Sequence, residues 1–278
     1  MPELPEVEAF KSYLEHHCMR QQIAEVHIKD KQVIKGISAL NFQKGLIDTA
    51  FKKVERRGKY LVIHLQHSKQ LLVMHFGMTG FLYYTKDIAE KVRFSCVAFI
   101  FNNDSVLHWI SIRKFEKLWL VDSIDEIKPL HEMGPEPLSL TKKQFLDLIA
   151  HNSKKNIKAF LMDQSTIAGI GNEYSDEIMF QSGIDPHHKI ADLSTGKITA
   201  LYTQMRKVLK YFVKRQGLDI SSERDNKFFS KADRASFKST YLQAHRHTDM
   251  LCPKNPKHHL KKATIAGRTS YYCPKDQE

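Results

Sequence analysis

The chain has few cysteines and lacks long apolar runs. Four cysteines in 278 residues are too few for a disulfide-stapled scaffold, which favours a reducing cytoplasm. No apolar run reaches membrane-spanning length, and the N-terminus lacks the basic-then-apolar pattern of a secretory signal, so we expect no membrane association. With 42% hydrophobic and 27% charged residues, the chain can form two domains with cores of their own.

Acidic residues are sparse in the second half of the chain. Residues 1–140 carry 19 Lys and Arg against 17 Asp and Glu, whereas residues 141–278 carry 24 against 14. A basic half of this kind predicts a polyanion as partner. A ribosomal or RNA-binding role fits this charge as well as DNA binding does, and a general solubility charge is a further explanation.

Hydrophobic patterning predicts a β-rich first part and a helical second part. Short β-branched and aromatic runs separated by polar turns fill residues 23–121, which predicts a mostly antiparallel sandwich or barrel. A helix is expected before them, from Pro5 to about Cys18. The rigid stretch Gly134-Pro135-Glu136-Pro137-Leu138 predicts a domain junction. Beyond it, helices are expected at 141–151, 156–164, 172–182 and 195–216.

The N-terminus, Met1-Pro2-Glu3, offers an unusual nucleophile. Because proline is small, we expect Met1 to be removed, which would leave a secondary amine on Pro2 next to the Glu3 carboxylate. An α-amino group has a pKa of about 7.7–8.0, so roughly a tenth is neutral and nucleophilic at pH 7. Such an amine can form an iminium ion with an aldehyde-level sugar carbon. The alternative is that the prolines only begin a helix.

Three segments of the β-rich part are candidates for ligand contact. Lys59, in Arg56-Arg57-Gly58-Lys59-Tyr60, would bind a phosphate as a point charge. The two glycines of His75-Phe76-Gly77-Met78-Thr79-Gly80 allow close backbone approach, and an exposed Met78 would act as an apolar wedge between bases. Arg113 and Phe115, two residues apart, would lie on the same side of the chain if this segment is extended. An exposed basic turn and ordinary sheet packing are the alternative explanations.

The helical part offers an anion site, and the C-terminal part offers a degenerate metal site. Gly169-Ile170-Gly171-Asn172 is a glycine-bearing turn before a helix, where backbone N–H groups attract anions and Asn172 would cap the helix. Cys252-Pro-Lys-Asn255 and Cys273-Pro-Lys-Asp276 each lack the second cysteine of a paired zinc site. His245, His247, His258 and His259 are near enough in sequence to substitute. Between the pairs, Ala266-Gly267-Arg268-Thr269 predicts a β-hairpin turn with arginine at its tip.

Together these segments resemble the formamidopyrimidine-DNA glycosylase family, which includes the endonuclease VIII enzymes. The resemblance covers nearly the whole chain, and the motifs occur in the family's order. It rests on these segments: Pro2 to Glu8, Arg57 to Tyr60, His75 to Gly80, Gly134 to Leu138, Ile170 to Glu177, and Gly267 to Thr269 before Cys273.

The resemblance implies an α+β multidomain fold and a function in base-excision repair. It implies a β-sandwich domain with a leading helix at 1–133, a helix–two-turn–helix domain at 134–240 and a β-hairpin finger at 241–278. It further implies a monomer that binds damaged double-stranded DNA, flips out the damaged nucleotide and removes oxidised bases. Cleavage of the abasic site by β,δ-elimination would follow through a Schiff base, with no cofactor required.

The resemblance also assigns roles to individual residues. Pro2 is the nucleophile, Glu3 the general acid and base, and Lys59 a phosphate contact that assists catalysis. The residues that fill the vacated hole and face the orphaned base are Met78, Arg113 and Phe115, which favours the formamidopyrimidine branch and oxidised purines. The residues implied to contact phosphates are Lys158, Asn172 and Arg268.

The chain departs from the family pattern in four places. The family has Asp-Pro before the arginine and Arg-Phe-Gly after it, where this chain has Ser111-Ile112 and Lys114-Phe115-Glu116. The base-recognition loop, at 217–239, and the segment Leu242 to His247 match poorly. Because the zinc cysteines are half lost, we expect a finger without zinc; a bound metal would use Cys252 and Cys273 with Asp276 or His258. Two other functions stay open: damage binding without excision, and general nucleic-acid binding.

Overall fold

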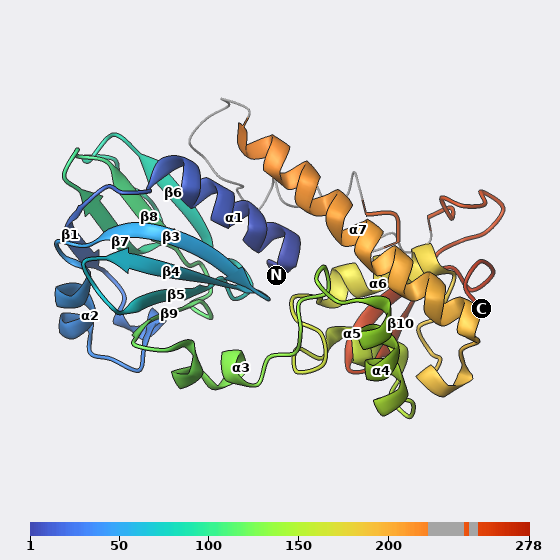
Figure 1. Ribbon diagram of the computed structural model, residues 1–278. Helices are drawn as coiled ribbons and strands as arrows, with labels where there is room; N and C mark the ends of the chain where they lie inside the picture. The colour runs from blue at the N-terminus through green and yellow to red at the C-terminus, as the bar shows by residue number, and fades with distance from the viewer. Residues whose placement is uncertain (222–241, 245–249) are drawn as a thin grey trace. The chain divides into compact units, whose positions relative to one another are not determined.

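A computed structural model describes residues 1–221, 242–244 and 250–278 (Figure 1). The chain divides into two compact units. Of the described residues, the first unit contains Met1–Glu132 and 213–221, and the second contains Met133–Phe212, 242–244 and 250–278. No helix in the described part of the chain is long and apolar enough to cross a membrane.

The first unit is a sandwich of two β-sheets (Figure 1). One sheet has the strand order β2-β9-β5-β4-β3 and the other β1-β7-β8-β6. Their neighbouring strands pair antiparallel, apart from the short parallel pair β2–β9. The strands are β1 Ile23–Ile28, β2 Ile34–Lys35, β3 Ala50–Arg57, β4 Tyr60–Gln66, β5 Leu71–His75, β6 Phe81–Thr85, β7 Ser95–Phe101, β8 Val106–Ile110 and β9 Lys117–Val121.

Aromatic side chains from both sheets form the core of the sandwich. The Phe51 ring of β3 meets the rings of Phe99 and Phe101 of β7 edge-on, with centroids 6.1 Å apart in both pairs. Trp109 of β8 is fully buried among the same apolar side chains. Inner faces that interdigitate in this way are typical of sandwiches. The predicted antiparallel β-sandwich is therefore confirmed.

Helix α1, Leu4–His17, leads into the sandwich. It begins where expected, because Pro5 fits the first turn of a helix and the Glu3 backbone N–H donates to Glu6 Oε2 at 2.7 Å. Val7, Phe10 and Leu14 are fully buried on one face, as the spacing predicted. This face lies against β3 and β4 (Figure 1). Shorter helical segments of the unit are η1 Lys31–Val33, α2 Ala39–Leu46, η2 Ile124–Glu126 and α3 Lys128–His131.

The second unit is built from helices and a terminal hairpin. Its elements are α4 Lys142–His151, α5 Ile157–Met162, α6 Asn172–Ser182, η3 Ile190–Asp192, β10 Lys261–Ile265, β11 Arg268–Tyr272 and the part of α7 Thr195–Ser221 up to Phe212. Polar caps set the helix starts: the Thr141 hydroxyl accepts from Gln144 N, and the Asn156 side chain accepts from Lys158 N. The four expected helices are present, and α7 continues beyond its expected end.

The hairpin turn has the backbone that its sequence predicts. Ala266 and Gly267 have φ angles of +50° and +70°, and two left-handed residues in succession suit a tight turn between antiparallel strands. Arg268 follows as the first residue of β11. The expected fold class, a β-sandwich, a helical domain and a hairpin finger, is therefore confirmed. The proposed base-recognition loop, from residue 222 onward, lies outside the described residues.

Candidate active site

Pro2 and Glu3 lie at the N-terminus of α1, and both are buried. Glu3 directly precedes the helix, where the positive end of the helix dipole favours a carboxylate. In the full chain Met1 precedes Pro2, so the Pro2 nitrogen is part of a peptide bond. Removal of Met1 would convert it into a secondary amine one residue from the Glu3 carboxylate.

Lys59 is held on a tight turn next to α1. The turn joins β3 to β4 through two residues, and Gly58 takes the left-handed backbone, at φ +55°, that it requires. Arg56 connects this turn to the helix: its Nε donates to Glu8 Oε2 at 2.7 Å and its Nη1 donates to Gly58 O at 3.1 Å. Lys59 and the N-terminus of α1 are therefore carried by two elements that one arginine side chain links.

The Glu8–Arg56 ion pair lowers the pKa of the Glu8 carboxyl. Burial alone would raise this pKa, but the hydrogen bonds and positive charges of Arg56 and Lys11 outweigh burial and bring the pKa below its usual range. The bond is thus charge-assisted at neutral pH, which strengthens it.

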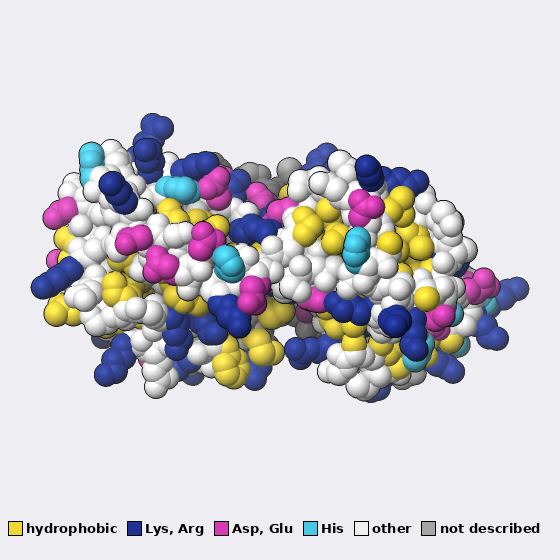
Figure 2. All heavy atoms as spheres, turned by 60° about the horizontal axis from the view of Figure 1, so that its bottom comes forward, with side chains coloured by type: hydrophobic (Ala, Val, Ile, Leu, Met, Phe, Trp, Pro, Cys, Tyr) yellow, Lys and Arg dark blue, Asp and Glu magenta, His cyan; other side chains and the backbone are white. Residues whose placement is uncertain are grey.

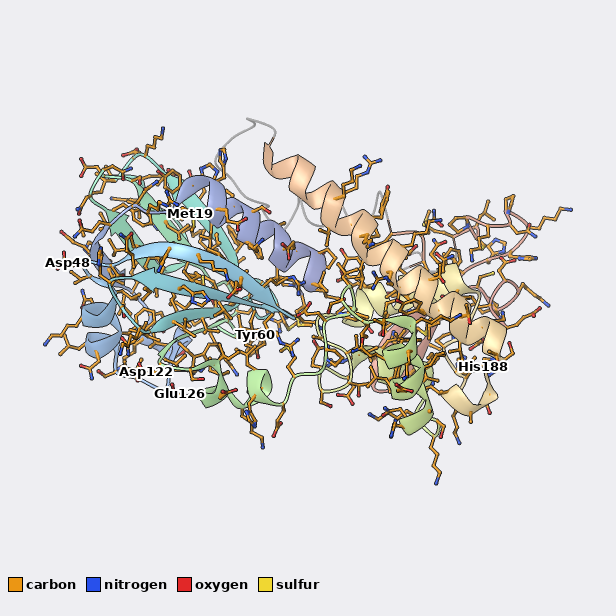
Figure 3. All side chains as sticks on the ribbon, in the orientation of Figure 1. Met19, Asp48, Tyr60, Asp122, Glu126 and His188 are labelled. Atoms are coloured by element: carbon orange, nitrogen blue, oxygen red, sulfur yellow. The ribbon has the colours of Figure 1, made fainter. Side chains whose placement is uncertain are left out.

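His75 is neutral beside Lys59. Burial, with the positive charges of Lys59 and Lys117, lowers the pKa of His75 to about 4. Its ring lies 4.5 Å from the ring of Tyr60, which follows the turn and is labelled in Figure 3. His75 therefore adds no positive charge here near pH 7.

Met78, Arg113 and Phe115 form one exposed cluster. The guanidinium carbon of Arg113 lies 5.1 Å from the centre of the Phe115 ring, and Arg113 Nη1 lies 3.5 Å from Met78 Sδ. Met78 is 45% exposed and Phe115 53%, unusually high for large apolar side chains. The structure thus brings together, from two loops, the three residues to which the resemblance assigns one shared role.

Lys158 is fully buried in the second unit. Its Nζ lies 2.6 Å from Asp176 Oδ1 and donates to Thr269 O at 3.2 Å, and neither side chain of the ion pair is exposed. The sequence predicted a phosphate contact for Lys158. In this arrangement the ammonium instead fixes the hairpin to α5 and α6, so a phosphate contact stays a prediction that would require the pair to open.

Asn172 and Arg268 are brought close by the hairpin. Asn172 Nδ2 donates to the backbone oxygen of Thr269, the residue after Arg268, at 3.0 Å. Arg268 is exposed. The prediction that Asn172 caps helix α6 is wrong in detail. Gly171 is the N-cap, Asn172 is the first helical residue, and the Asn172 side chain bonds to the hairpin. Lys and Arg side chains are spread over the surfaces of both units (Figure 2).

The two finger cysteines meet at Asp276. Cys252 Sγ and Cys273 Sγ lie 2.9 and 3.0 Å from Asp276 Oδ2, and His258 Nδ1 lies 2.9 Å from the same oxygen. Cys252, Cys273 and Asp276 lie close enough together to hold a metal ion, and His258 beside Asp276 offers a fourth ligand of the kind that a closed structural zinc site takes. The finger without zinc therefore stays a prediction from the sequence. His245 and His247 lie outside the described residues.

Glu116 was not predicted as a functional residue. The sequence marked it as a departure from the family pattern, but it did not show that its carboxylate is fully buried between the two loops that carry Met78, Arg113 and Phe115. Apart from that departure, the sequence shows only an acidic residue next to an expected strand. Such residues are common on protein surfaces, so the sequence offered no reason to single out Glu116.

Known proteins match the chain over its full length. Residues 1–118 match the formamidopyrimidine-DNA glycosylase N-terminal domain, and residues 133–224 match the H2TH domain of the same enzymes. The formamidopyrimidine-DNA glycosylase of Pelotomaculum thermopropionicum is 34% identical over 100% of this chain and 99% of its own length. That of Moorella thermoacetica is 32% identical, over 91% of this chain and 92% of its own length.

A similar solved structure is the Lactococcus lactis Fpg in complex with DNA that contains an abasic site. It has a TM-score of 0.85 and 26% identity, and the match covers 99% of both chains. A second, of the same L. lactis protein with DNA that contains N7-benzyl-Fapy-dG, also has a TM-score of 0.85 and 26% identity, over 100% of both chains. The chain therefore belongs to the formamidopyrimidine-DNA glycosylase family.

Proposed function

We propose that this protein is a base-excision DNA glycosylase with AP lyase activity, which removes oxidised bases, preferentially purines, from double-stranded DNA. The observation that carries the proposal is Pro2-Glu3 at the buried start of α1, with the Lys59 turn linked to that helix through Arg56. Relatives named formamidopyrimidine-DNA glycosylase, and a similar structure in complex with abasic-site DNA, support it.

In the proposed reaction the Pro2 nitrogen attacks C1′ of the damaged nucleotide. The bond between C1′ and the base breaks, the base leaves, and the sugar ring opens to give an iminium ion. Glu3 donates a proton to the ring oxygen and then takes protons during elimination, because a carboxylate next to the amine can serve as both acid and base. The 3′ phosphate leaves first and the 5′ phosphate second, and hydrolysis of the iminium frees Pro2.

The remaining site residues would hold the DNA in place. Lys59, Asn172 and Arg268 are proposed to bind phosphates, which would make the affinity for DNA strongly dependent on salt. Met78, Arg113 and Phe115 are proposed to fill the gap left by the flipped nucleotide, because an apolar wedge offsets the cost of unstacking. Their exposure and mutual contacts support this role.

The expected domain organisation is retained as part of the proposal. We assign 1–133 to the catalytic β-sandwich, 134–240 to the helix–two-turn–helix domain and 241–278 to the finger. We further propose that the protein acts as a monomer in the cytoplasm and requires no cofactor. The replacement of the second cysteine of each zinc pair by Asn255 and Asp276 supports a finger that folds without metal.

A panel of lesion duplexes tests the proposed function. Protein without Met1 is incubated with an intact duplex and with duplexes that contain 8-oxoguanine, a formamidopyrimidine, an oxidised pyrimidine or an abasic site. Both strand cleavage and binding affinity are measured for each duplex. We expect cleavage at abasic sites and at oxidised purines. Tight binding to damaged duplexes with no cleavage at any of them would favour a damage-binding protein, and equal affinity for damaged and intact duplexes would favour general nucleic-acid binding.

A further inference from the structure

Two loops carry the wedge cluster, defined as Met78, Arg113 and Phe115. The first loop, residues 76–80, follows β5, and the second, residues 111–116, joins β8 to β9. The exposed cluster side chains contact each other only weakly, through one cation–π contact and one contact to sulfur. Contacts beneath them must therefore determine how firmly the wedge is held.

The carboxylate of Glu116 connects the two loops below the wedge cluster. Glu116 is fully buried. Its Oε1 accepts from the backbone N–H of Thr79 at 2.9 Å and from the Thr79 hydroxyl at 2.8 Å, and its Oε2 accepts from the Ser111 hydroxyl. One side chain therefore binds both loops.

The Glu116 carboxylate also sets the direction of the next hydrogen bonds. Because a carboxylate can only accept, the hydroxyls of Thr79 and Ser111 must both donate to it and have lone pairs left for other donors. The backbone N–H of Arg113 donates to Thr79 Oγ1 at 3.2 Å, and that of Lys114 donates to Ser111 Oγ at 3.0 Å. The network thus extends from Glu116 to the backbone of the wedge cluster itself.

The glycines of the first loop allow the two loops to touch. A Cβ on Gly77 would lie 2.9 Å from the backbone nitrogen of Glu116, and one on Gly80 would lie 2.5 Å from Glu116 Cγ. The sequence offered two uses for these glycines, approach to a ligand or an unusual turn. Gly77 has the left-handed backbone of such a turn, at φ +50°, and both glycines also allow one loop to pack closely on the other.

Ser111 and Glu116 are two positions at which the chain departs from the family pattern described above, which has aspartate at the first and glycine at the second. In this chain the two side chains are hydrogen-bonded to one another, and Glu116 supplies the carboxylate.

We propose that Glu116 is a positioning residue that holds the wedge cluster ready to enter the DNA. The inference rests on the proposed function, because it assumes that Met78, Arg113 and Phe115 fill the gap left by a flipped nucleotide. Glu116 touches neither the sugar nor the base. It acts through Thr79, Ser111 and the backbone of Arg113, and its effect falls on steps that need the nucleotide to leave an intact duplex.

The variant Glu116→Gln tests the proposal. An amide offers only one acceptor oxygen, so with that oxygen facing Thr79 the amide NH2 faces Ser111, whose hydroxyl must turn away and loses its acceptor. Excision of an oxidised purine from a duplex should slow by about tenfold to a hundredfold, the range expected for a small misplacement of positioned groups. Borohydride trapping on a single-stranded abasic oligonucleotide, where no partner strand needs a wedge, should keep the wild-type rate.

Two further variants separate positioning from general damage to the fold. Glu90→Gln makes the same change in a carboxylate that accepts from the Tyr83 hydroxyl, and it should leave both rates unchanged. The double variant Ser111→Asp/Glu116→Gly restores the family pattern and should recover most of the duplex rate. Equal loss on duplex and single-stranded substrates, or wild-type rates for Glu116→Gln on both, would overturn the proposal.

A binding measurement keeps this test distinct from that of the proposed function. The fluorescence of 2-aminopurine, placed opposite a stable abasic analogue, reports insertion of side chains without any chemistry. Binding of the wild-type protein should change this fluorescence, and the Glu116→Gln variant should cause a smaller change. A wild type that inserts but does not cleave would refute the proposed function and leave the role of Glu116 supported. A wild type that causes no fluorescence change would overturn the role of Glu116.

Discussion

Glu116 in the first unit and Asp176 in the second are both buried carboxylates, and each fixes a segment with candidate DNA contacts. Glu116 accepts hydrogen bonds from neutral donors of Thr79 and Ser111. Asp176 is bonded to the ammonium of Lys158, with Ser270 Oγ 2.6 Å from Oδ1 and Tyr271 N 3.2 Å from Oδ2. One segment is held by neutral donors and the other by an ion pair.

The neutral donors of Glu116 and the cation of Asp176 differ in how much stability is lost when one of them is removed. A buried ion pair that loses one member leaves an uncompensated charge, which costs much more than a missing neutral donor. The hairpin with Arg268 should therefore be the more vulnerable segment to a single substitution. The wedge cluster should tolerate changes in its donors with a smaller loss of stability.

Lys158→Met should have the largest effect on stability. Methionine has a similar length but no charge, so Asp176 stays buried without its cation and the free energy of unfolding should fall by about 3–5 kcal/mol. Lys155→Met is the matched control, because the Lys155–Asp163 pair is partly exposed and should contribute about 1 kcal/mol or less. Urea denaturation compares the two. Equal losses would contradict the contrast between the buried and the exposed pair.

Substitution of single serines should have an intermediate effect. Ser270→Ala removes a donor to Asp176 and Ser111→Ala removes a donor to Glu116, and each should lower the free energy of unfolding by about 1.5–3 kcal/mol. Ser139→Ala, whose exposed hydroxyl donates to Glu136 O, should stay within about 0.5 kcal/mol of wild type. If Ser111→Ala leaves the free energy of unfolding unchanged, the Glu116 network does not hold the loop.

The partly exposed pair of Lys155 and Asp163 should show the smallest effect, at acid pH. Burial alone would raise the pKa of Asp163, but hydrogen bonds from Lys155 and Ser165 outweigh it and lower the pKa from 3.8 to about 2. Because the folded pKa is the lower one, this contribution to stability is complete above about pH 4 and is lost as the pH falls through 2. Carboxyl NMR should give a midpoint near 2, and Lys155→Met should raise it; an unchanged midpoint would contradict this assignment.

The sequence predicted those features that depend on local patterns. Helix α1 was predicted from the spacing of Val7, Phe10 and Leu14, and the hairpin turn from Ala266-Gly267. Helix α6 occupies its expected residues because glycines bound it at both ends. The polar cap was placed one residue too far along, since Asn172 and Gly171 are both plausible caps and only the contact with Thr269 distinguishes them.

The features that the sequence could not provide all depend on contacts between distant residues. Lys158 is a basic residue in a helix like several others, and its burial follows from Asp176, 18 residues away, and from Thr269, 111 residues away. In the sequence, Glu116 is only an exception to the family pattern. Its role depends on Thr79 and Ser111, which surround its carboxylate in the fold. Likewise, Asp276 bonds to Cys252 and to Cys273, which are far apart in the chain.

The central claim is that Pro2 is the nucleophile, and borohydride trapping tests it most directly. Protein without Met1 is mixed with duplex DNA that contains one abasic site, the iminium ion is reduced, and the adduct is mapped by peptide mass spectrometry. We predict a covalent adduct on the Pro2 nitrogen, and none when Met1 is retained or the Pro2 nitrogen is blocked. An adduct on an internal lysine such as Lys59, or no adduct with the free N-terminus, would contradict the account.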